Sequence, residues 1–375
     1  MRIIHVSDCY APRTGGIETQ VRDLARAQAA AGHEVHVLTA TPGAAGERGG
    51  AIELDDGVVV HRLGAQVPFD LPVNPAAPPK VRALLAELPP GVVHVHAGVL
   101  SPFAFDGARV AVEAGAPVAI TWHCMLDGAV PVLRAAVRAS RWADAPVALS
   151  AVSGAAAARV AQVFDAQVGV VPNGMDQKVW APAARRSAPG RPVRVVATMR
   201  LAPRKRGPAL VDVMADVASQ LEPGDLTLDV IGDGPARGSM EKRAERRGLT
   251  GVVRFRGRLE RSAVRDAYAD ADVFVAPAVL EAFGIAALEA RTAGLVVVAH
   301  RGTGIEEFVT HDVDGLLVDD DAGMARALVR LVHEPGLLAR LRTAASAEPP
   351  VFDWAHALGA AQTEYARARS LAAGG

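Results

Sequence analysis

The chain has 375 residues, half of them hydrophobic, which is enough apolar material for the cores of two α/β domains of ordinary size. Charged residues make up 22% and the formal net charge is −1, which argues against nucleic acid as the main partner, because phosphate backbones require a clear basic excess. The two cysteines, Cys9 and Cys124, have no Cys-x-x-Cys spacing. We therefore expect no disulfide framework and a reducing, cytoplasmic compartment.

The first apolar run stops at Asp8, which makes it too short for the core of a signal peptide or for a membrane span. No later apolar run reaches spanning length without a charge. These runs predict a soluble protein.

The first forty residues predict a strand–helix–strand unit. An apolar run at 3–7 is followed by a turn-rich loop at 8–16. A helix follows, with apolar or uncharged residues at i, i+3, i+4, i+7 and i+8 from Val21, and Gly32 ends it. A second strand at 35–39 completes the unit.

The same alternation recurs in both halves of the chain. A proline-containing segment without an apolar face, 181–192, predicts a linker. We expect an α/β protein with two doubly wound, Rossmann-like domains, at 1–182 and 192–350, facing each other across a cleft that holds the ligands. The other predicted strands are 92–96, 118–122, 147–152, 168–171, 193–199, 226–231, 252–255, 273–276, 296–299 and 316–318.

A glycine-rich turn, Gly15-Gly16-Ile17-Glu18, lies between the first strand and the first helix. Paired glycines let backbone amides approach an anion, and the helix N-terminus adds partial positive charge. A plain strand-to-helix turn is the alternative. The Gly-x-Gly-x-x-Gly fingerprint of dinucleotide-binding enzymes is missing here.

Two cations, Arg200 and Lys205, follow the first strand of the second half. Cations just beyond a strand end suit a diphosphate whose charge grows as it leaves. The alternative is a solvated basic loop, since Arg204 and Arg206 lie beside them.

The most specific segment is 277–290, in which a predicted strand, loop and helix follow one another. Glu281 and Gly284 lie in the loop, the helix begins near Ile285, and Glu289 lies on it. The free amides of such a helix bind phosphate, and Glu289 can accept hydrogen bonds from ribose hydroxyls.

On these motifs the chain resembles the retaining glycosyltransferases of family 4, which have the GT-B fold, over nearly its whole length. The Glu281-x7-Glu289 pair carries most of the resemblance. The other matching segments are Gly15 to Glu18, Val171-Pro172-Asn173-Gly174-Met175-Asp176, Arg200 with Lys205, Ile231-Gly232-Asp233-Gly234-Pro235 and Phe352-Asp353-Trp354.

The resemblance implies transfer of a hexose-type sugar from a UDP- or GDP-linked donor to a small-molecule, glycan or lipid acceptor, with no cofactor and no obligatory metal. It implies that a C-terminal helix, 354–371, packs back on the first domain. His123 and Glu281 would act at the transferred sugar, and Glu18 and Asn173 at the acceptor. The implied donor-binding residues are Gly15, Gly16, Arg200, Lys205, Gly257, Arg258, Phe283, Gly284, Ile285 and Glu289.

Other polar residues have simpler interpretations. We expect His94 and His96 to alternate across one strand and so not to bind a metal together. The run Asp319–Asp321 predicts a solvated N-cap loop, and a buried structural role is the alternative for His123. A stripe of Arg134, Arg138 and Arg141 with Trp142 suits an anionic acceptor or a membrane surface, a plain solvated face being the alternative.

The segment 122–127, around His123, is more apolar than the family pattern leads us to expect. Two rival functions stay open: a nucleotide-sugar epimerase of the same fold, and a binding module without activity. The four charged residues Arg200, Lys205, Glu281 and Glu289 argue against the second.

Overall fold

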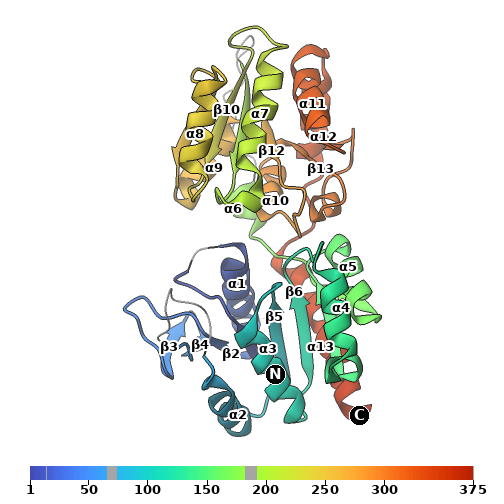
Figure 1. Ribbon diagram of the computed structural model, residues 1–375. Helices are drawn as coiled ribbons and strands as arrows, with labels where there is room; N and C mark the ends of the chain where they lie inside the picture. The colour runs from blue at the N-terminus through green and yellow to red at the C-terminus, as the bar shows by residue number, and fades with distance from the viewer. Residues whose placement is uncertain (14, 66–73, 182–191, 375) are drawn as a thin grey trace. The chain divides into compact units, whose positions relative to one another are not determined.

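A computed structural model describes residues 1–13, 15–65, 74–181 and 192–374 (Figure 1). They form two compact units, Met1–Met175 together with Phe352–Gly375, and Asp176–Val351. The chain thus passes between the units twice. The predicted linker lies almost wholly outside the described residues, as does the predicted domain end at 182. Among the described residues, no helix is long and apolar enough to cross a membrane.

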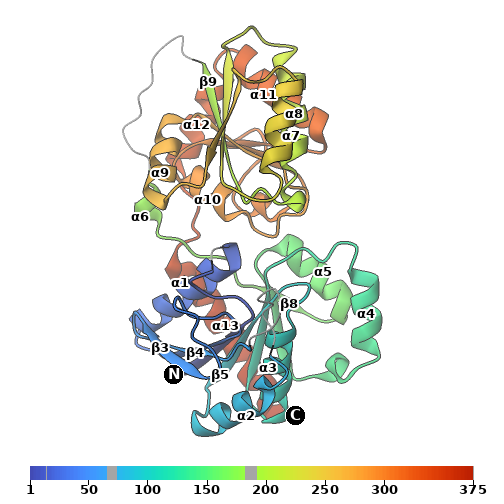
Figure 2. The ribbon, with the colours of Figure 1, turned by 60° about the vertical axis from the view of Figure 1, so that its left-hand side comes forward.

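The first unit is a sheet with helices on both faces (Figures 1 and 2). Its strand order is β3-β4-β2-β1-β5-β6-β7-β8, and every neighbouring pair is parallel except β3 with β4. The elements are β1 (Arg2–Ser7), α1 (Gly16–Ala30), β2 (Glu34–Thr39), β3 (Ala51–Asp55), β4 (Val58–Arg62), α2 (Ala77–Glu87), β5 (Val92–Ala97), α3 (Pro102–Glu113), β6 (Val118–Trp122), α4 (Val130–Arg138), a 3₁₀ turn (Arg141–Asp144), β7 (Val147–Ala151), α5 (Gly154–Phe164), β8 (Val168–Val170) and α13 (Trp354–Gly374).

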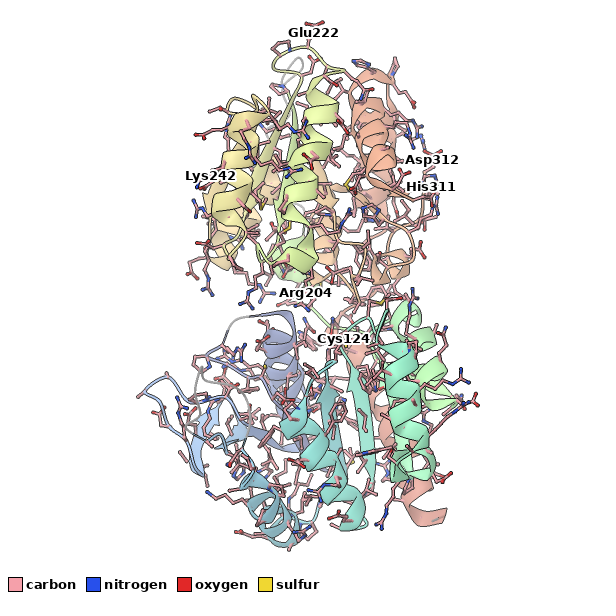
Figure 3. All side chains as sticks on the ribbon, in the orientation of Figure 1. Cys124, Arg204, Glu222, Lys242, His311 and Asp312 are labelled. Atoms are coloured by element: carbon pink, nitrogen blue, oxygen red, sulfur yellow. The ribbon has the colours of Figure 1, made fainter. Side chains whose placement is uncertain are left out.

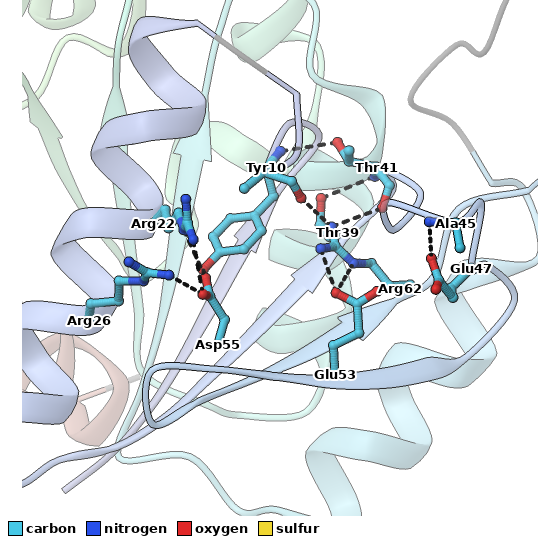
Figure 4. Close-up of polar contacts among 11 residues, drawn as sticks. Tyr10, Arg22, Arg26, Thr39, Thr41, Ala45, Glu47, Glu53, Asp55 and Arg62 are labelled. Carbon is cyan, nitrogen blue, oxygen red and sulfur yellow. Dashed lines mark hydrogen bonds and ion pairs between the residues drawn. The ribbon is translucent and has the colours of Figure 1, made fainter. Parts of the chain in front are cut away.

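The hairpin of β3 and β4 is absent from the elements that the sequence led us to expect. Its two-residue turn, Asp56-Gly57, has positive φ at both positions (47° and 84°), the geometry in which Asp-Gly joins antiparallel strands. Asp55 at the end of β3 accepts hydrogen bonds from Tyr10 and from Arg22 on α1, which ties the hairpin to the rest of the unit (Figure 4).

One face of the central strands β1, β5, β6 and β7 changes from apolar to polar along the strands. Near the amino ends it carries Ile3, Val92, Ala119 and Ala148, which pack against Tyr365 and its neighbours on α13. Two residues further on, where the period of a strand returns to the same face, it carries His5, His94, Thr121 and Ser150, all buried.

The second unit has strand order β11-β10-β9-β12-β13-β14, all parallel. Its sheet contributes Val, Ala and Leu side chains to one large apolar cluster. The elements are α6 (Gln177–Trp180), β9 (Val193–Thr198), a 3₁₀ turn (Pro203–Lys205), α7 (Gly207–Ala218), β10 (Leu226–Ile231), α8 (Arg237–Arg246), β11 (Val253–Gly257), α9 (Arg261–Asp270), β12 (Val273–Ala276), α10 (Ile285–Thr292), β13 (Val296–His300), a 3₁₀ turn (Gly304–Glu307), β14 (Gly315–Val318), α11 (Asp321–His333) and α12 (Leu337–Ala347).

Each strand order reverses direction once, between β1 and β5 in the first unit and between β9 and β12 in the second. Ligands of open α/β sheets bind beyond the carboxyl ends of the strands at such a switch point. The loops that follow these strands are therefore where functional side chains are expected.

Candidate active site

At the switch point of the second unit, cations and a carboxylate follow the neighbouring strands β9 and β12. Arg200 comes after β9; its side chain is exposed and makes no hydrogen bond or ion pair with any described residue. Lys205 ends the following 3₁₀ turn, and its Nζ donates a hydrogen bond to Oε2 of Glu281 in the loop after β12. Arg204, labelled in Figure 3, is exposed on the same turn. Lys205 and Glu281 thus meet, whereas Arg200 is available to a ligand.

Helix α10 begins directly after Gly284, which has a φ of 91°. A side chain at Gly284 would be strained by that φ, and its Cβ would lie 2.7 Å from Cγ1 of Ile305. No side chain caps the helix, so the first N–H groups, beginning with that of Ile285, lack intrahelical partners. Phe283 is buried against Phe308, so a donor would contact its main chain and not its ring.

Glu289 lies on α10, one turn beyond Ile285, with little of its side chain exposed. Its carboxylate is 3.8 Å from Nη2 of Arg261 on α9, a loose ion pair. Burial, together with the nearby Glu289 carboxylate, raises the pKa of Tyr268 well above its usual value. Tyr268 therefore stays protonated. The carboxylate oxygens of Glu289 can accept hydrogen bonds from hydroxyl groups.

Gly257 and Arg258 stand at the carboxyl end of β11. Gly257 has a φ of 68°, and its carbonyl accepts a hydrogen bond of 2.8 Å from the N–H of Gly232 in the loop after β10. Gly232 itself admits no side chain, because a Cβ would lie 1.9 Å from the carbonyl oxygen of Met199. The segment of the predicted donor-binding residues Gly257 and Arg258 is thus joined by backbone contacts to the loops after β9 and β10.

In the first unit, the glycine turn closes over a carboxylate of its own. Helix α1 begins at Gly16, and Glu18 folds back so that a Cβ on Gly15 would lie 2.3 Å from its Oε2. Arg13 lies 3.7 Å from the Glu18 carboxylate. Glycine at position 15 therefore makes room for Glu18, a reason that the sequence did not reveal.

His123 and Asn173, predicted from different motifs, line the same small cavity in the first unit, together with Gln20, Gly174 and Trp354. Nε2 of Gln20 donates a 3.1 Å hydrogen bond to the carbonyl of Gly174, and the Trp354 ring covers Gly174 so closely that a Cβ would lie 2.5 Å from it. Gln20 and Trp354 were not among the predicted site residues; their contacts come from segments far apart in the sequence.

His123 follows β6 and is followed by Cys124 (Figure 3). Its backbone N–H donates a hydrogen bond to the carbonyl of Ala97 (2.9 Å), and Nε2 of its ring lies 2.9 Å from Nδ1 of His96. Burial lowers the pKa of His123 to about 4, so its imidazole is neutral near pH 7. His123 as a whole residue is partly exposed.

The expectation that His94 and His96 face opposite sides of their strand is wrong. Side chains of a strand alternate with a period of two, so residues two apart share a face. The two rings lie 4.2 Å apart between centroids, and together with His5 they could hold a metal ion by proximity alone.

The aspartate run after β14 agrees with its predicted capping role. Asp320 is the N-cap of α11 and accepts a hydrogen bond from the N–H of Gly323. Asp321 accepts two hydrogen bonds from Arg206.

Comparison with known proteins identifies the class of enzyme. A family described as Glycosyltransferase Family 4 matches residues 14–179, and one described as Glycosyl transferases group 1 matches residues 183–348. The chain therefore belongs to the family 4 glycosyltransferases and is an enzyme of that class, as its motifs predicted.

Two curated proteins that are similar in sequence to this chain have different named activities. A GDP-mannose-dependent alpha-(1-6)-phosphatidylinositol dimannoside mannosyltransferase of Mycobacterium tuberculosis is 29% identical, covering 95% of this chain and 94% of the relative. A phosphatidylinositol N-acetylglucosaminyltransferase subunit of Arabidopsis thaliana is 28% identical, covering 88% and 74%. These relatives give no support to the epimerase alternative.

Solved structures share the fold at low identity. Anabaena HepE in complex with UDP has a TM-score of 0.73 at 20% identity, covering 97% of this chain and 99% of that one. WaaG, a glycosyltransferase involved in lipopolysaccharide biosynthesis, has a TM-score of 0.71 at 17% identity, covering 96% and 99%. The predicted fold class is confirmed.

Proposed function

We propose that this chain transfers a mannosyl residue from GDP-mannose, with retention of configuration, to a hydroxyl of an acceptor that contains inositol phosphate. Several relatives support the donor by their names, including a GDP-mannose-dependent alpha-mannosyltransferase of Mycolicibacterium smegmatis. Others support the acceptor, among them a D-inositol 3-phosphate glycosyltransferase of Streptomyces scabiei.

The switch point of the second unit carries the proposal. Arg200 is an exposed cation without a partner among the described residues, and α10 presents uncapped N–H groups. Both favour a diphosphate, and more strongly as it gains charge on leaving the sugar. Glu289 on the same helix would hold the ribose hydroxyls, and Glu281 the sugar.

Retention rests on the resemblance of the Glu281 and Glu289 segment to that of the retaining family. The acceptor oxygen would bond to the anomeric carbon on the face from which the diphosphate departs, and a departing phosphate oxygen would take the acceptor's proton. The protein's part is then to position both substrates and to stabilise the charge of the leaving group. We propose that this needs no metal ion and takes place in the cytoplasm.

We propose that the acceptor binds to the first unit, near Glu18, His123 and Asn173. Helix α4 buries none of its residues, exposes Val132 and carries Arg138 in its last turn, with Arg141 just beyond. An amphipathic, basic helix of this kind suits the surface of an anionic membrane, where a lipid acceptor would lie.

The test is an assay with radiolabelled GDP-mannose and two acceptor forms, a soluble inositol phosphate and phosphatidylinositol in vesicles. We expect an α-linked mannosyl product from at least one form, at a rate that EDTA leaves unchanged. Vesicle flotation then distinguishes the soluble acceptor from the lipid acceptor, since a lipid acceptor requires that the protein bind to anionic vesicles. Transfer only from other nucleotide sugars, or a β-linked product, would contradict the proposal, and interconversion of the donor without acceptor would revive the epimerase.

A further inference from the structure

A continuous row of hydrogen bonds, here called the histidine relay, runs through the interior of the first unit from β1, β5, β6 and β7 to α1 and α13. Every member is buried except His123, which is partly exposed. In order, the relay consists of His123, His96, His5, Gln28, Tyr365, His94, Thr121, Ser150 and the carbonyl of Ile120, joined at 2.7–3.2 Å.

The direction of the relay is fixed at its buried end. The carbonyl of Ile120 can only accept, so the hydroxyl of Ser150 donates to it. Ser150 has then used its proton and accepts from Thr121, and Thr121 in turn accepts from Nε2 of His94. A neutral imidazole carries one N–H, so Nδ1 of His94 has a free lone pair.

The same reasoning continues through the two helices. Nδ1 of His94 accepts from the hydroxyl of Tyr365, which has then used its only proton and accepts from the amide nitrogen of Gln28. This orients the Gln28 amide, and its oxygen accepts from Nε2 of His5.

The last two steps lead to the surface. His5 carries its proton on Nε2, so its Nδ1 accepts from Nε2 of His96. Nδ1 of His96 then accepts from Nε2 of His123. Burial lowers the pKa of all four histidines, to about 4 for His5 and His123, which keeps each neutral as the sequence of donors requires.

We propose that the relay holds His123 as the Nε2–H tautomer, so that its Nδ1 presents a lone pair to a substrate hydroxyl. His96, His5, Gln28 and Tyr365 are thus positioning residues that act through His123. The tautomer follows from the relay alone, whereas the contact with a hydroxyl rests on the proposed function.

A metal ion on His5, His94 and His96 is the competing explanation of the cluster. In the relay, however, all six ring nitrogens of these residues already have hydrogen-bond partners. A metal would have to break several of these bonds in a buried place. The relay therefore accounts for the cluster without an ion.

The sharpest test replaces Thr121, several hydrogen bonds from His123 along the relay. Thr121→Val leaves His94 Nε2–H without an acceptor, and a buried N–H without a partner is costlier than a buried lone pair. If every hydrogen bond between His94 and His123 reverses its direction, that cost disappears and the His123 proton moves to Nδ1. Thr121→Ser keeps the hydroxyl and is the matched control.

The tautomer is read from two-bond ¹H–¹⁵N correlation spectra of histidine-labelled protein, with His123 assigned by its loss in His123→Gln. We expect only Nε2–H at His123 in the wild type and in Thr121→Ser, and an Nδ1–H signal in Thr121→Val. An unchanged tautomer in the Val variant would overturn the proposal. So would a shift of the His5, His94 and His96 signals on adding Zn²⁺ to the wild type.

A second pair of variants guards against misfolding at position 121. Tyr365→Phe interrupts the relay between the helices and frees the Gln28 amide to turn over, so Nδ1–H should again appear at His123. Tyr10→Phe is the control, because it removes a tyrosine hydroxyl that bonds Asp55 in the same unit, outside the relay (Figure 4). A wild-type tautomer in Tyr365→Phe would contradict the proposal.

The kinetics separate this proposal from the proposed function. Loss of one hydrogen bond of about 1.4 kcal/mol corresponds to a fall in kcat/KM of about tenfold in Thr121→Val, with Thr121→Ser near the wild type. A changed tautomer with unchanged kinetics would uphold the relay and refute a substrate contact at His123. Absence of mannosyl transfer by the wild type would refute the proposed function and leave the spectra as the test of the relay.

Discussion

The two units share a doubly wound topology but place their polar residues differently. The central strands of the first unit bury histidines, a threonine and a serine in a directed row of hydrogen bonds. The central strands of the second unit bury an apolar cluster, and most of its predicted site residues stand in the loops at the strand ends or at the start of α10. The same fold can therefore position a site from within the core or from its rim.

The difference lies in what holds each site residue. In the first unit, hydrogen bonds from buried side chains hold His123. Its tautomer therefore depends on which of these side chains carry protons. In the second, backbone geometry does this work: Gly284 ends a loop at a positive φ, and Gly232 lets two loops approach each other. We therefore expect acid to lower the stability of the first unit. In the second unit we expect substitutions of individual residues at the strand ends to lower ligand binding or turnover.

The largest expected effect is that acid destabilises the first unit more than the second. Burial lowers the pKa of His5, His61 and His123 to about 4 and that of His94 and His96 well below 6.5. The unfolded chain titrates near 6.5, so between about pH 6.5 and 4 it binds more protons than the folded unit, and stability falls with falling pH.

Two carboxyl groups oppose this trend. Burial raises the pKa of Asp8 to about 6 and that of Glu364 above its usual value, so their contributions are present at low pH and are lost as pH rises. Burial also lowers the pKa of His33, so six histidines outweigh two carboxyl groups in the first unit, whereas among the described residues of the second unit the pKa of one histidine, His300, is lowered. Limited proteolysis at about pH 5 should cut the first unit first; early cuts within 176–351 would reverse the comparison.

The next largest effect concerns the cations at the rim of the second unit. Arg200→Ala should weaken GDP binding about tenfold to a hundredfold, since a charge-assisted contact contributes roughly 1.5–3 kcal/mol. Its melting temperature should not change, because the side chain has no partner among the described residues. Lys205→Ala should lose binding and also stability, because it leaves Glu281 without its cation.

Calorimetric titration with GDP and with guanosine checks this prediction. Guanosine, which has no phosphate, should bind both variants as it binds the wild type. An equal loss for guanosine would mean that these residues support the fold and not the diphosphate.

The smallest effect separates the two glutamates. Glu289→Gln should raise the KM for the donor about threefold to tenfold, because ribose hydroxyls are bound alike before and during transfer. Glu281→Gln should lower kcat instead, since the sugar beside it gains charge in the transition state. Steady-state kinetics with varied donor distinguish the two, and exchanged signatures would refute these roles.

Much of the architecture could be predicted from local pattern. Each predicted strand has a counterpart within a residue or two, because apolar runs between turn residues carry this information along the chain. The pair Glu281 and Glu289 could be singled out because its strand–loop–helix context is also local. The hairpin of β3 and β4 was missed although Asp56-Gly57 between two strands is a strong turn signal.

The relay could not be found from local pattern. His94 and Tyr365 hydrogen-bond across 271 positions, and His5 and His96 across 91. Only the strand order brings these residues together, and the sequence does not state that order. The error over His94 and His96 had a simpler origin. Residues two apart in a strand lie on the same face, and they were assigned to opposite faces.

The return of α13 to the first unit has a consequence for how the protein is made. The second unit is one continuous stretch, complete once Val351 has left the ribosome, whereas the first needs residues from both ends. Until α13 is synthesised, the apolar sheet face of Ile3, Val92, Ala119 and Ala148 lacks its cover. Domains usually fold in the order of synthesis; here we expect the second unit to fold first, while the nascent first unit exposes a surface that chaperones can bind.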